Sequence, residues 1–322
     1  MPGVRHAFMK TGLLLPAWSY AAAGATFTTR ELLAFAEQAV LAGFESLWVS
    51  DHFLNEPFSD YAAVGIEFPE EMRGVKSGQW ECWSLLAALA VRTPDVTLGT
   101  LVTNTAFRNP ALLARIIDTV DDLSGGRLVV GLGAGDFASE HQAFGYDFTR
   151  PIARFEEALA VIRPLLRGET LTHHGAFYHT EHASLLPKSL RADGPPIMIG
   201  LLRGGPRMLR LVAHYADQWN CMLPFSDSRV GSYSAAWQQV RAACEKHGRD
   251  PATLARNVTI GVCLSDHYPL PGARPLRGSQ QQLIDVCCAY REHGLEILRM
   301  VIEPYTPATL EFLAPVLAAV RG

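Results

Sequence analysis

The sequence has no run of about 18 apolar residues, the length that a membrane-spanning helix needs. Its longest apolar stretches are interrupted by Arg, Glu or Pro, and residues 1–15 lack the apolar core and cleavage site of a signal peptide. Excess charge is also lacking, since the formal net charge is only −4 over 322 residues. These absences argue against a membrane or nucleic-acid partner and predict a cytoplasmic protein.

Paired metal-ligand spacing is absent as well. The cysteines are scattered along the chain, which predicts free buried thiols. They are Cys82, Cys221, Cys244, Cys263, Cys287 and Cys288. Four histidines between positions 173 and 182 have no cysteine or carboxylate at ligand spacing, so they indicate a surface hairpin. No metal site is predicted.

What the chain does contain is an alternation of strand-like and helix-like stretches, repeated eight times. The expected strands are 11–15, 46–50, 96–102, 128–132, 196–200, 217–222, 258–264 and 296–302. Helix patterns follow them, among them 28–41 after a Thr cap and the amphipathic stretch 151–166. The pattern predicts an α/β fold, a TIM (β/α)8 barrel in one domain spanning 1–322, with an open doubly wound sheet as the alternative.

Two segments interrupt the alternation. Residues 170–186 have Gly175 between two β-rich arms and predict a hairpin insertion. A long loop of nearly thirty residues, 52–79, follows the second strand. It carries Phe58, Tyr61, Ile66 and Phe68, and loops of this length are typical of functional lids, so we expect it to cover a mostly apolar substrate.

The stretch 125–145 has the strongest features of a site. Glycines 131, 133 and 135 follow the fourth strand and allow close approach of a ligand, but they match a dinucleotide fingerprint poorly. Asp136 and Glu140 come next, and from spacing alone a functional role for them stays open. His52 ends the second strand beside Asp51, and imidazole is the readiest proton carrier at neutral pH. In a barrel all these residues lie at the carboxyl end of the strands.

Gly204 and Gly205 precede Pro206 at the start of a helix, with Arg203 and Arg207 nearby. Free backbone N–H groups and the helix dipole make such a turn suitable for phosphate. An ordinary turn from strand to helix is the alternative.

Six stretches together resemble the bacterial-luciferase-like superfamily of flavin and deazaflavin oxidoreductases. They are residues 42–53, 98–103, 108–114, 123–141, 204–207 and 215–220. The resemblance implies a TIM barrel, usually dimeric, that holds its cofactor at the carboxyl end of the strands, with a non-proline cis peptide at Leu101-Val102 behind the ring. The cofactor contacts that the resemblance implies are Asp51, Leu101, Val102, Thr103, Ala134, Gly135, Ser139, Gly200, Arg203, Gly204 and Gly205.

The Asp51-His52 pair resembles the branch that uses the deazaflavin coenzyme F420. The implied function is hydride transfer between F420 and a small, mostly apolar organic substrate, with His52 as first choice to handle the proton and Asp136 or Glu140 as second. The alternative is an FMN-dependent two-component monooxygenase of the same family. Either enzyme would act on a small molecule, with a reductase supplying the reduced cofactor, and would form a homodimer. Asn55-Glu56 after the Asp-His pair departs from the pattern of the sugar-phosphate dehydrogenases and argues against that substrate.

Overall fold

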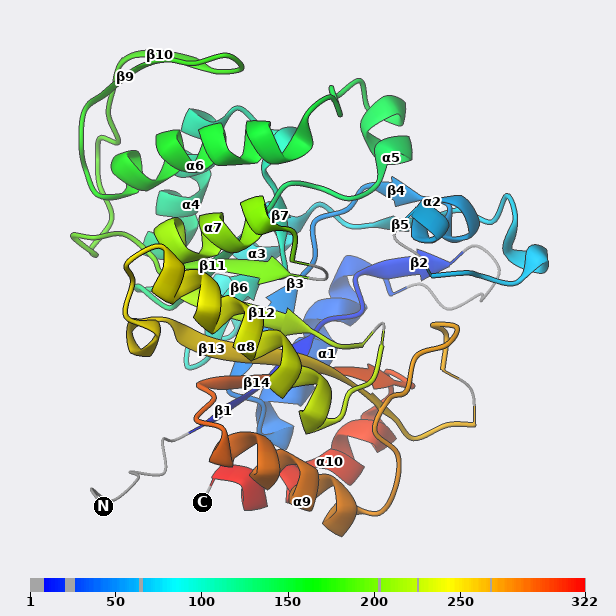
Figure 1. The fold of residues 1–322 in the computed structure, drawn as a ribbon. Coiled ribbons are helices and arrows are strands. Elements are labelled where there is room, and N and C mark those ends of the chain that lie inside the picture. Colours follow the sequence, from blue (N-terminus) through cyan, green and yellow to red (C-terminus); the bar gives the residue numbers. More distant parts are fainter. Residues whose placement is uncertain are drawn as a thin grey trace, which may run out of the picture.

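The computed structural model describes residues 9–20, 27–63, 66–201, 204–224, 226–266 and 268–321. Eight parallel strands run in the order β11-β12-β13-β14-β1-β3-β6-β8, and pairing of β8 with β11 closes them into a (β/α)8 barrel (Figure 1). The barrel strands are β1 (Lys10–Leu14), β3 (Ser46–Val49), β6 (Thr97–Thr100), β8 (Leu128–Gly133), β11 (Ile197–Leu201), β12 (Gln218–Met222), β13 (Ala255–Cys263) and β14 (Ile297–Glu303). The predicted barrel is confirmed, and the open sheet is excluded.

Helices surround the barrel, and residues that favour helix ends stand at several of their termini. Thr28 caps α1 in a capping box with Glu31, and Gly43 ends it with a φ of 115°. Asn109 caps α4, which has Pro110 as its first residue. The helices are α1 (Thr29–Ala42), α3 (Cys82–Arg92), α4 (Pro110–Leu123), α6 (Pro151–Leu166), α7 (Pro206–Tyr215), α8 (Val230–Lys246), α9 (Gln280–Glu292) and α10 (Pro307–Arg321).

The long segment after β3 has more structure than a loop. It contains β4 (Leu54–Asn55), α2 (Pro57–Ala63), the 3-10 turn η1 (Glu70–Met72) and β5 (Ser77–Gln79). β5 pairs with β4 and with β2 (Trp18–Tyr20) in a small antiparallel sheet beside the barrel. We call residues 54–79 the insertion. The sequence missed these elements because each is only two to seven residues long.

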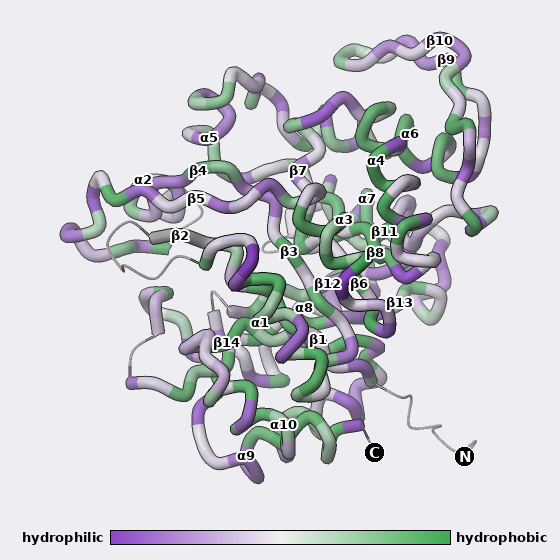
Figure 2. Tube along the Cα trace, turned by 180° about the vertical axis from the view of Figure 1, so that it is seen from behind, coloured by the Kyte–Doolittle hydropathy of each residue, from purple (hydrophilic) through white to green (hydrophobic). Residues whose placement is uncertain are grey.

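The predicted hairpin is confirmed as β9 (Leu171–His174) and β10 (His179–Ala183). It projects from the body of the protein, and many of its residues are hydrophilic (Figure 2). Each of the six cysteines is a free thiol, and all but Cys288 are buried. Among the described residues, no helix has both the length and the apolar content to cross a membrane.

The barrel interior is filled by a few large side chains that face glycines. Trp48 on β3 is fully buried, and its ring lies against Gly99 of β6, where an added Cβ would be 2.2 Å from the indole. Met198 on β11 faces Gly131 in the same manner, with 2.9 Å from the added Cβ to its Cε atom. The glycines of these strands therefore make room for core side chains as well as for any ligand.

We expect replacement of Gly99 by alanine to destabilise the protein by roughly 1 to 3 kcal/mol, because the new methyl group overlaps the Trp48 ring. Gly231 in α8 is the matched control, since an added Cβ there meets nothing within 4 Å. Gly231→Ala should leave the stability unchanged or raise it by up to about 1 kcal/mol. Urea unfolding of the three proteins measures both effects, and equal stabilities would contradict the packing argument.

Candidate active site

The three predicted catalytic residues meet at the carboxyl end of the barrel, which we call the mouth. His52 follows β3, Asp136 follows β8, and Glu140 lies on α5 (Ala138–Ala143), a short helix that the sequence pattern did not reveal. His52 Nδ1 donates to Glu140 Oε1 over 2.9 Å, and the backbone N–H of Phe53 donates to Glu140 Oε2 over 3.0 Å. Glu140 is fully buried, so these two donors fix its carboxylate in place.

His52 is held in its charged form. Burial disfavours the imidazolium, but the hydrogen bond to Glu140 and the charges of Asp136, Glu140 and Asp51 raise the pKa of His52 to about 9. Its Nε2 atom lies 4.0 Å from Asp136 Oδ1. At neutral pH both ring nitrogens therefore carry protons, one donated to Glu140 and the other directed toward Asp136.

Asp136 is the more accessible of the two acids. Its side chain is 44% exposed, whereas that of Glu140 is buried. Desolvation by the surrounding protein and the charge of Glu140 raise the pKa of Asp136, and the charge of His52 opposes this effect. Asp136 is thus a carboxylate that solvent and a small molecule can reach.

The same three residues are the group in the described part of the chain whose geometry could hold a metal ion. One ligand atom from each of His52, Asp136 and Glu140 lies within 4.8 Å of the others. The same two carboxylates raise the pKa of His52, so a proton and a metal ion would compete for its ring nitrogens.

The raised pKa of His52 makes the stability of the protein depend on pH. The stabilisation is fully present below pH about 6.5, where a free histidine is also protonated, and it is lost as the pH rises through about 9. In Glu140→Gln one of the charges that raise the pKa of His52 is removed, so the loss should end at lower pH and be smaller. Urea unfolding between pH 6 and 10 measures this, and identical pH profiles for the two proteins would contradict it.

Asp51 lies beneath the site and is paired within the protein. Its carboxylate accepts two hydrogen bonds from Arg108, of 2.7 and 3.1 Å, and one from the Asn104 backbone N–H. Arg108 also donates to Glu81, and although burial opposes its charge, the two carboxylates raise the pKa of Arg108. With Asp51 only 1% exposed, this geometry favours a positioning role over the predicted direct contact with a cofactor. Sequence reasoning gave Arg108 no role, although it lies in the motif 108–114.

Side-chain hydrogen bonds hold α5 in place on both sides. Ser139, a predicted cofactor contact, donates to Asp60 of the insertion over 2.7 Å. On the other side His141 is fully buried, and its Nδ1 lies 2.8 Å from the Phe137 carbonyl while its Nε2 lies 3.2 Å from Asn104 Nδ2. The Ser139 hydroxyl therefore uses its proton in a hydrogen bond within the protein.

Phe137 connects the insertion to His52. Its ring stacks on the His52 ring with 4.9 Å between centroids, and Tyr61 packs against it at 5.0 Å. Ile66 and Phe68 complete this buried group, which we call the Phe137 cluster. The apolar residues expected to line a lid thus pack mainly against one another and against the loop that carries Asp136.

The predicted cis peptide is present at Leu101-Val102, beyond the end of β6. The chain then pairs again with β8 as β7 (Thr103–Asn104). Val102 is partly exposed and fits between two glycines: an added Cβ would lie 2.7 Å from it at Gly133 and 3.1 Å from it at Gly200. Glycine at position 133 makes room for the Val102 side chain. We call the apolar surface that Val102 forms with Gly133 and Gly200 the floor of the mouth. Thr103, next to this floor, is fully buried.

Ala134 and Gly135 lie between the floor and Asp136. Gly135 has a φ of +81°, and an added Cβ would meet the Asn104 side chain at 2.6 Å and His141 at 2.9 Å. This position therefore requires glycine for two reasons, its backbone conformation and its close neighbours.

The other predicted cofactor contacts lie at the start of α7. Gly205 is the N-cap residue and no side chain caps the helix, so the first N–H groups remain available to an anion. An added Cβ at Gly205 meets nothing within 4 Å, and at Gly204 it meets the side chains of Leu209 at 3.1 Å and Leu201 at 3.7 Å. Arg207 pairs with Glu156, and Arg203 lies outside the described residues.

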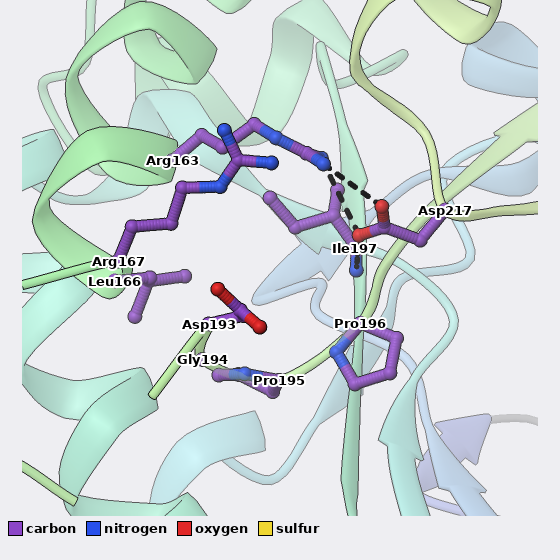
Figure 3. Close-up of a pocket in the computed structure, with 9 residues that line it drawn as sticks. All are labelled: Arg163, Leu166, Arg167, Asp193, Gly194, Pro195, Pro196, Ile197 and Asp217. Atoms are coloured by element: carbon purple, nitrogen blue, oxygen red, sulfur yellow. Dashed lines mark hydrogen bonds and ion pairs between the residues drawn. The ribbon is translucent and has the colours of Figure 1, made fainter. Parts of the chain in front are cut away.

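A cavity of about 330 Å³ lies at the opposite, amino-terminal end of the barrel (Figure 3). The Asp217 carboxylate in this cavity accepts hydrogen bonds from Arg163 and from the Ile197 N–H. Arg167 and Asp193 also line the cavity. None of the predicted site residues contributes to this cavity, so it is separate from the site around His52.

The family model described as luciferase-like monooxygenase matches residues 9–267 of the chain. The chain belongs to the luciferase-like monooxygenase family. A phthiodiolone/phenolphthiodiolone dimycocerosates ketoreductase of Mycobacterium kansasii is 35% identical over 229 residues, covering 70% of this chain and 60% of that protein. A 5,10-methylenetetrahydromethanopterin reductase of Methanolobus tindarius is 30% identical over 231 residues, covering 72% and 60%. The match thus spans about three fifths of the length of these relatives. Both relatives are named as reductases. The predicted membership of the luciferase-like family is confirmed.

Solved structures of the luciferase-like fold superpose on almost the whole chain. An F420-dependent secondary alcohol dehydrogenase, solved with an F420-acetone adduct, has a TM-score of 0.76 at 18% identity and covers 98% of this chain and 99% of its own. An EDTA monooxygenase from Chelativorans sp. BNC1 has a TM-score of 0.72 at 15% identity, with 97% and 94% covered. At these identities the likeness shows the fold alone.

Proposed function

We propose that this protein is an F420-dependent oxidoreductase that transfers hydride between the deazaflavin and the carbonyl carbon of a small, mostly apolar substrate. The observation that carries the proposal is the hydrogen bond between His52 and Glu140 at the mouth of the barrel, where the neighbouring carboxylates raise the pKa of His52. A carbonyl that accepts a hydride also needs a proton on its oxygen, and an imidazolium supplies it. The names of the relatives, a ketoreductase and an alcohol dehydrogenase, agree with this chemistry.

The residues of the mouth fit a flat ring with a phosphate-bearing chain. Val102 offers an apolar surface that Gly133 and Gly200 leave clear of side chains. The uncapped start of α7 at Gly205 suits the phosphate, with Gly204 beside it. Ala134 and Gly135 lie along the ring in this arrangement, and Leu101 and Thr103 hold Val102 in place. Bound there, the deazaflavin supplies or accepts the hydride.

The chain's own residues handle the proton and the substrate. His52 donates from Nε2 to the substrate oxygen, and Glu140 keeps the ring oriented and charged. Asp136 borders the same space and exchanges protons with solvent. Met222 and Val301, which are partly exposed and pack beside Val102, contribute apolar surface for the substrate.

Titration with each cofactor tests the proposal. The protein should bind F420 in the micromolar range or tighter, and with reduced F420 it should convert a panel of small ketones to alcohols. Tight FMN binding without F420 binding, together with oxygen uptake in the presence of reduced FMN, would overturn it in favour of the two-component monooxygenase. A reductase that supplies reduced cofactor would then be a required partner.

We also propose that the protein forms a homodimer through the neighbouring helices α1, α3 and α4. These helices pack side by side and expose large apolar residues to solvent. They are Leu41, Val91, Leu112 and Leu123, which are 47 to 88% exposed. Buried against a second copy, these side chains would leave water.

Leu112→Glu should convert the dimer to a monomer, because it places a charge in this apolar interface. Ala242→Glu, at an exposed position on α8, is the matched control and should leave the dimer intact. Light scattering after size exclusion measures the mass of each. A wild-type monomer, or a dimer that Leu112→Glu does not weaken, would contradict this interface.

A further inference from the structure

Arg299 is a buried cation inside the barrel that the chemistry at His52 does not use. It lies on β14 and is fully buried. Its guanidinium carbon lies 3.5 Å from the centroid of the Trp48 ring, and its Nη1 donates to Asn220 Oδ1 over 2.8 Å. Nε and Nη2 have no hydrogen-bond partner among the described residues.

The charge of Arg299 is not compensated by a carboxylate in the described part of the chain. Burial lowers the pKa of Arg299, and no charged neighbour acts on it in either direction. A guanidinium nevertheless stays protonated because it is the strongest base among side chains, and the Trp48 ring face and the Asn220 oxygen offset part of the desolvation. A lone buried charge costs stability, and such costs are typical of functional positions.

Arg299 lies one side-chain layer below the mouth. Val301 follows two residues later on the same face of β14, about 7 Å further along the strand. Val301 and Val102 both pack on the group of interior residues that includes Trp48, and both are partly exposed. A ring on the Val102 floor would therefore be separated from the guanidinium by little more than these apolar side chains, which screen its charge weakly.

We propose that Arg299 stabilises negative charge on the cofactor ring and so favours the reduced form of the bound cofactor. This rests on the proposed function. Hydride transfer from an alcohol would bring two electrons and one proton to a ring held at the mouth and would so add one negative charge to it. The alcohol would be oxidised to the carbonyl compound, and its hydroxyl proton would pass to the accessible carboxylate of Asp136. Arg299 touches neither reactant and acts through its field.

The test measures the affinity of each variant for oxidised and for reduced F420 and compares the ratio of the two. Arg299→Met removes the charge, and Asn220→Asp keeps the arginine but pairs it with a carboxylate of the same size. Both should lower the preference for reduced F420 by about tenfold, which corresponds to about 30 mV for a two-electron couple. Arg299→Lys should retain part of the preference. Arg167→Met, which removes a positive charge at the opposite end of the barrel, is the matched control and should change nothing.

The proposal is overturned if folded Asn220→Asp keeps the wild-type ratio of affinities within twofold. This variant decides the matter even if Arg299→Met fails to fold, because it preserves size and leaves Arg299 in place. Failure of the proposed function looks different, since the wild type would then bind neither form of F420. If FMN binds instead, the same ratio is measured with FMN and the same outcomes apply.

Discussion

His52→Asn should lower kcat for carbonyl reduction by about 10²- to 10⁴-fold, the range that a positioned acid contributes. Asparagine keeps a polar group near Glu140 but cannot deliver a proton from the position of Nε2. Affinity for F420 should stay within a few fold, because the floor at Val102 and the start of α7 are unchanged. Steady-state kinetics with reduced F420 and a ketone measure the first effect, and a binding titration measures the second.

His173→Asn is the matched control for His52. His173 also faces a carboxylate, that of Glu157 at 3.4 Å, but it lies on the hairpin strand β9 away from the mouth. Its replacement should leave kcat unchanged. Equal activities of wild type and His52→Asn would remove His52 from the proton transfer while leaving the F420 assignment intact.

Arg108→Met should destabilise the protein by about 3 to 5 kcal/mol, because it leaves the Asp51 carboxylate buried without its ionic partner. Asp51 directly precedes His52, so the loss of order should also reduce activity. The matched control is Arg92→Met, which breaks an exposed pair with Glu37 and should cost less than about 1 kcal/mol.

Urea unfolding at neutral pH compares the three proteins. A cost for Arg108→Met no greater than that for Arg92→Met would show that Asp51 is protonated or hydrated in the native protein. It would then be free to contact a ligand, as the sequence led us to expect.

The barrel could be predicted from the sequence because periodicity and capping act locally. Helix α6 has the predicted bounds, Pro151–Leu166, since its apolar spacing and its proline are both strong signals. The third strand was predicted to reach residue 102 but β6 ends at Thr100, because an apolar run does not reveal that the pairing with β8 is interrupted between Gly99 and Thr103. The helix α5 was missed because six residues are too few to show a helical period.

The site could be predicted in position but not in its contacts. The rule that functional residues follow barrel strands placed His52, Asp136 and Glu140 at one end of the barrel. It could not show that His52 donates to Glu140, 88 residues away, or that Asp51 faces Arg108. Arg299 went unnoticed because an arginine within an apolar strand suggests a solvent-facing position, and only the closed barrel shows that it points inward.

The hydrogen bond between Ser139 and Asp60 limits how this protein can be redesigned. It joins the insertion to the same short helix that carries Glu140, and the Phe137 cluster reinforces the connection. An insertion taken from a relative with another substrate would arrive without partners for Ser139 and Phe137, and the His52–Glu140 pair would lose its alignment. A graft that exchanges substrate preference must therefore transfer residues 54–79 and 137–141 as one unit.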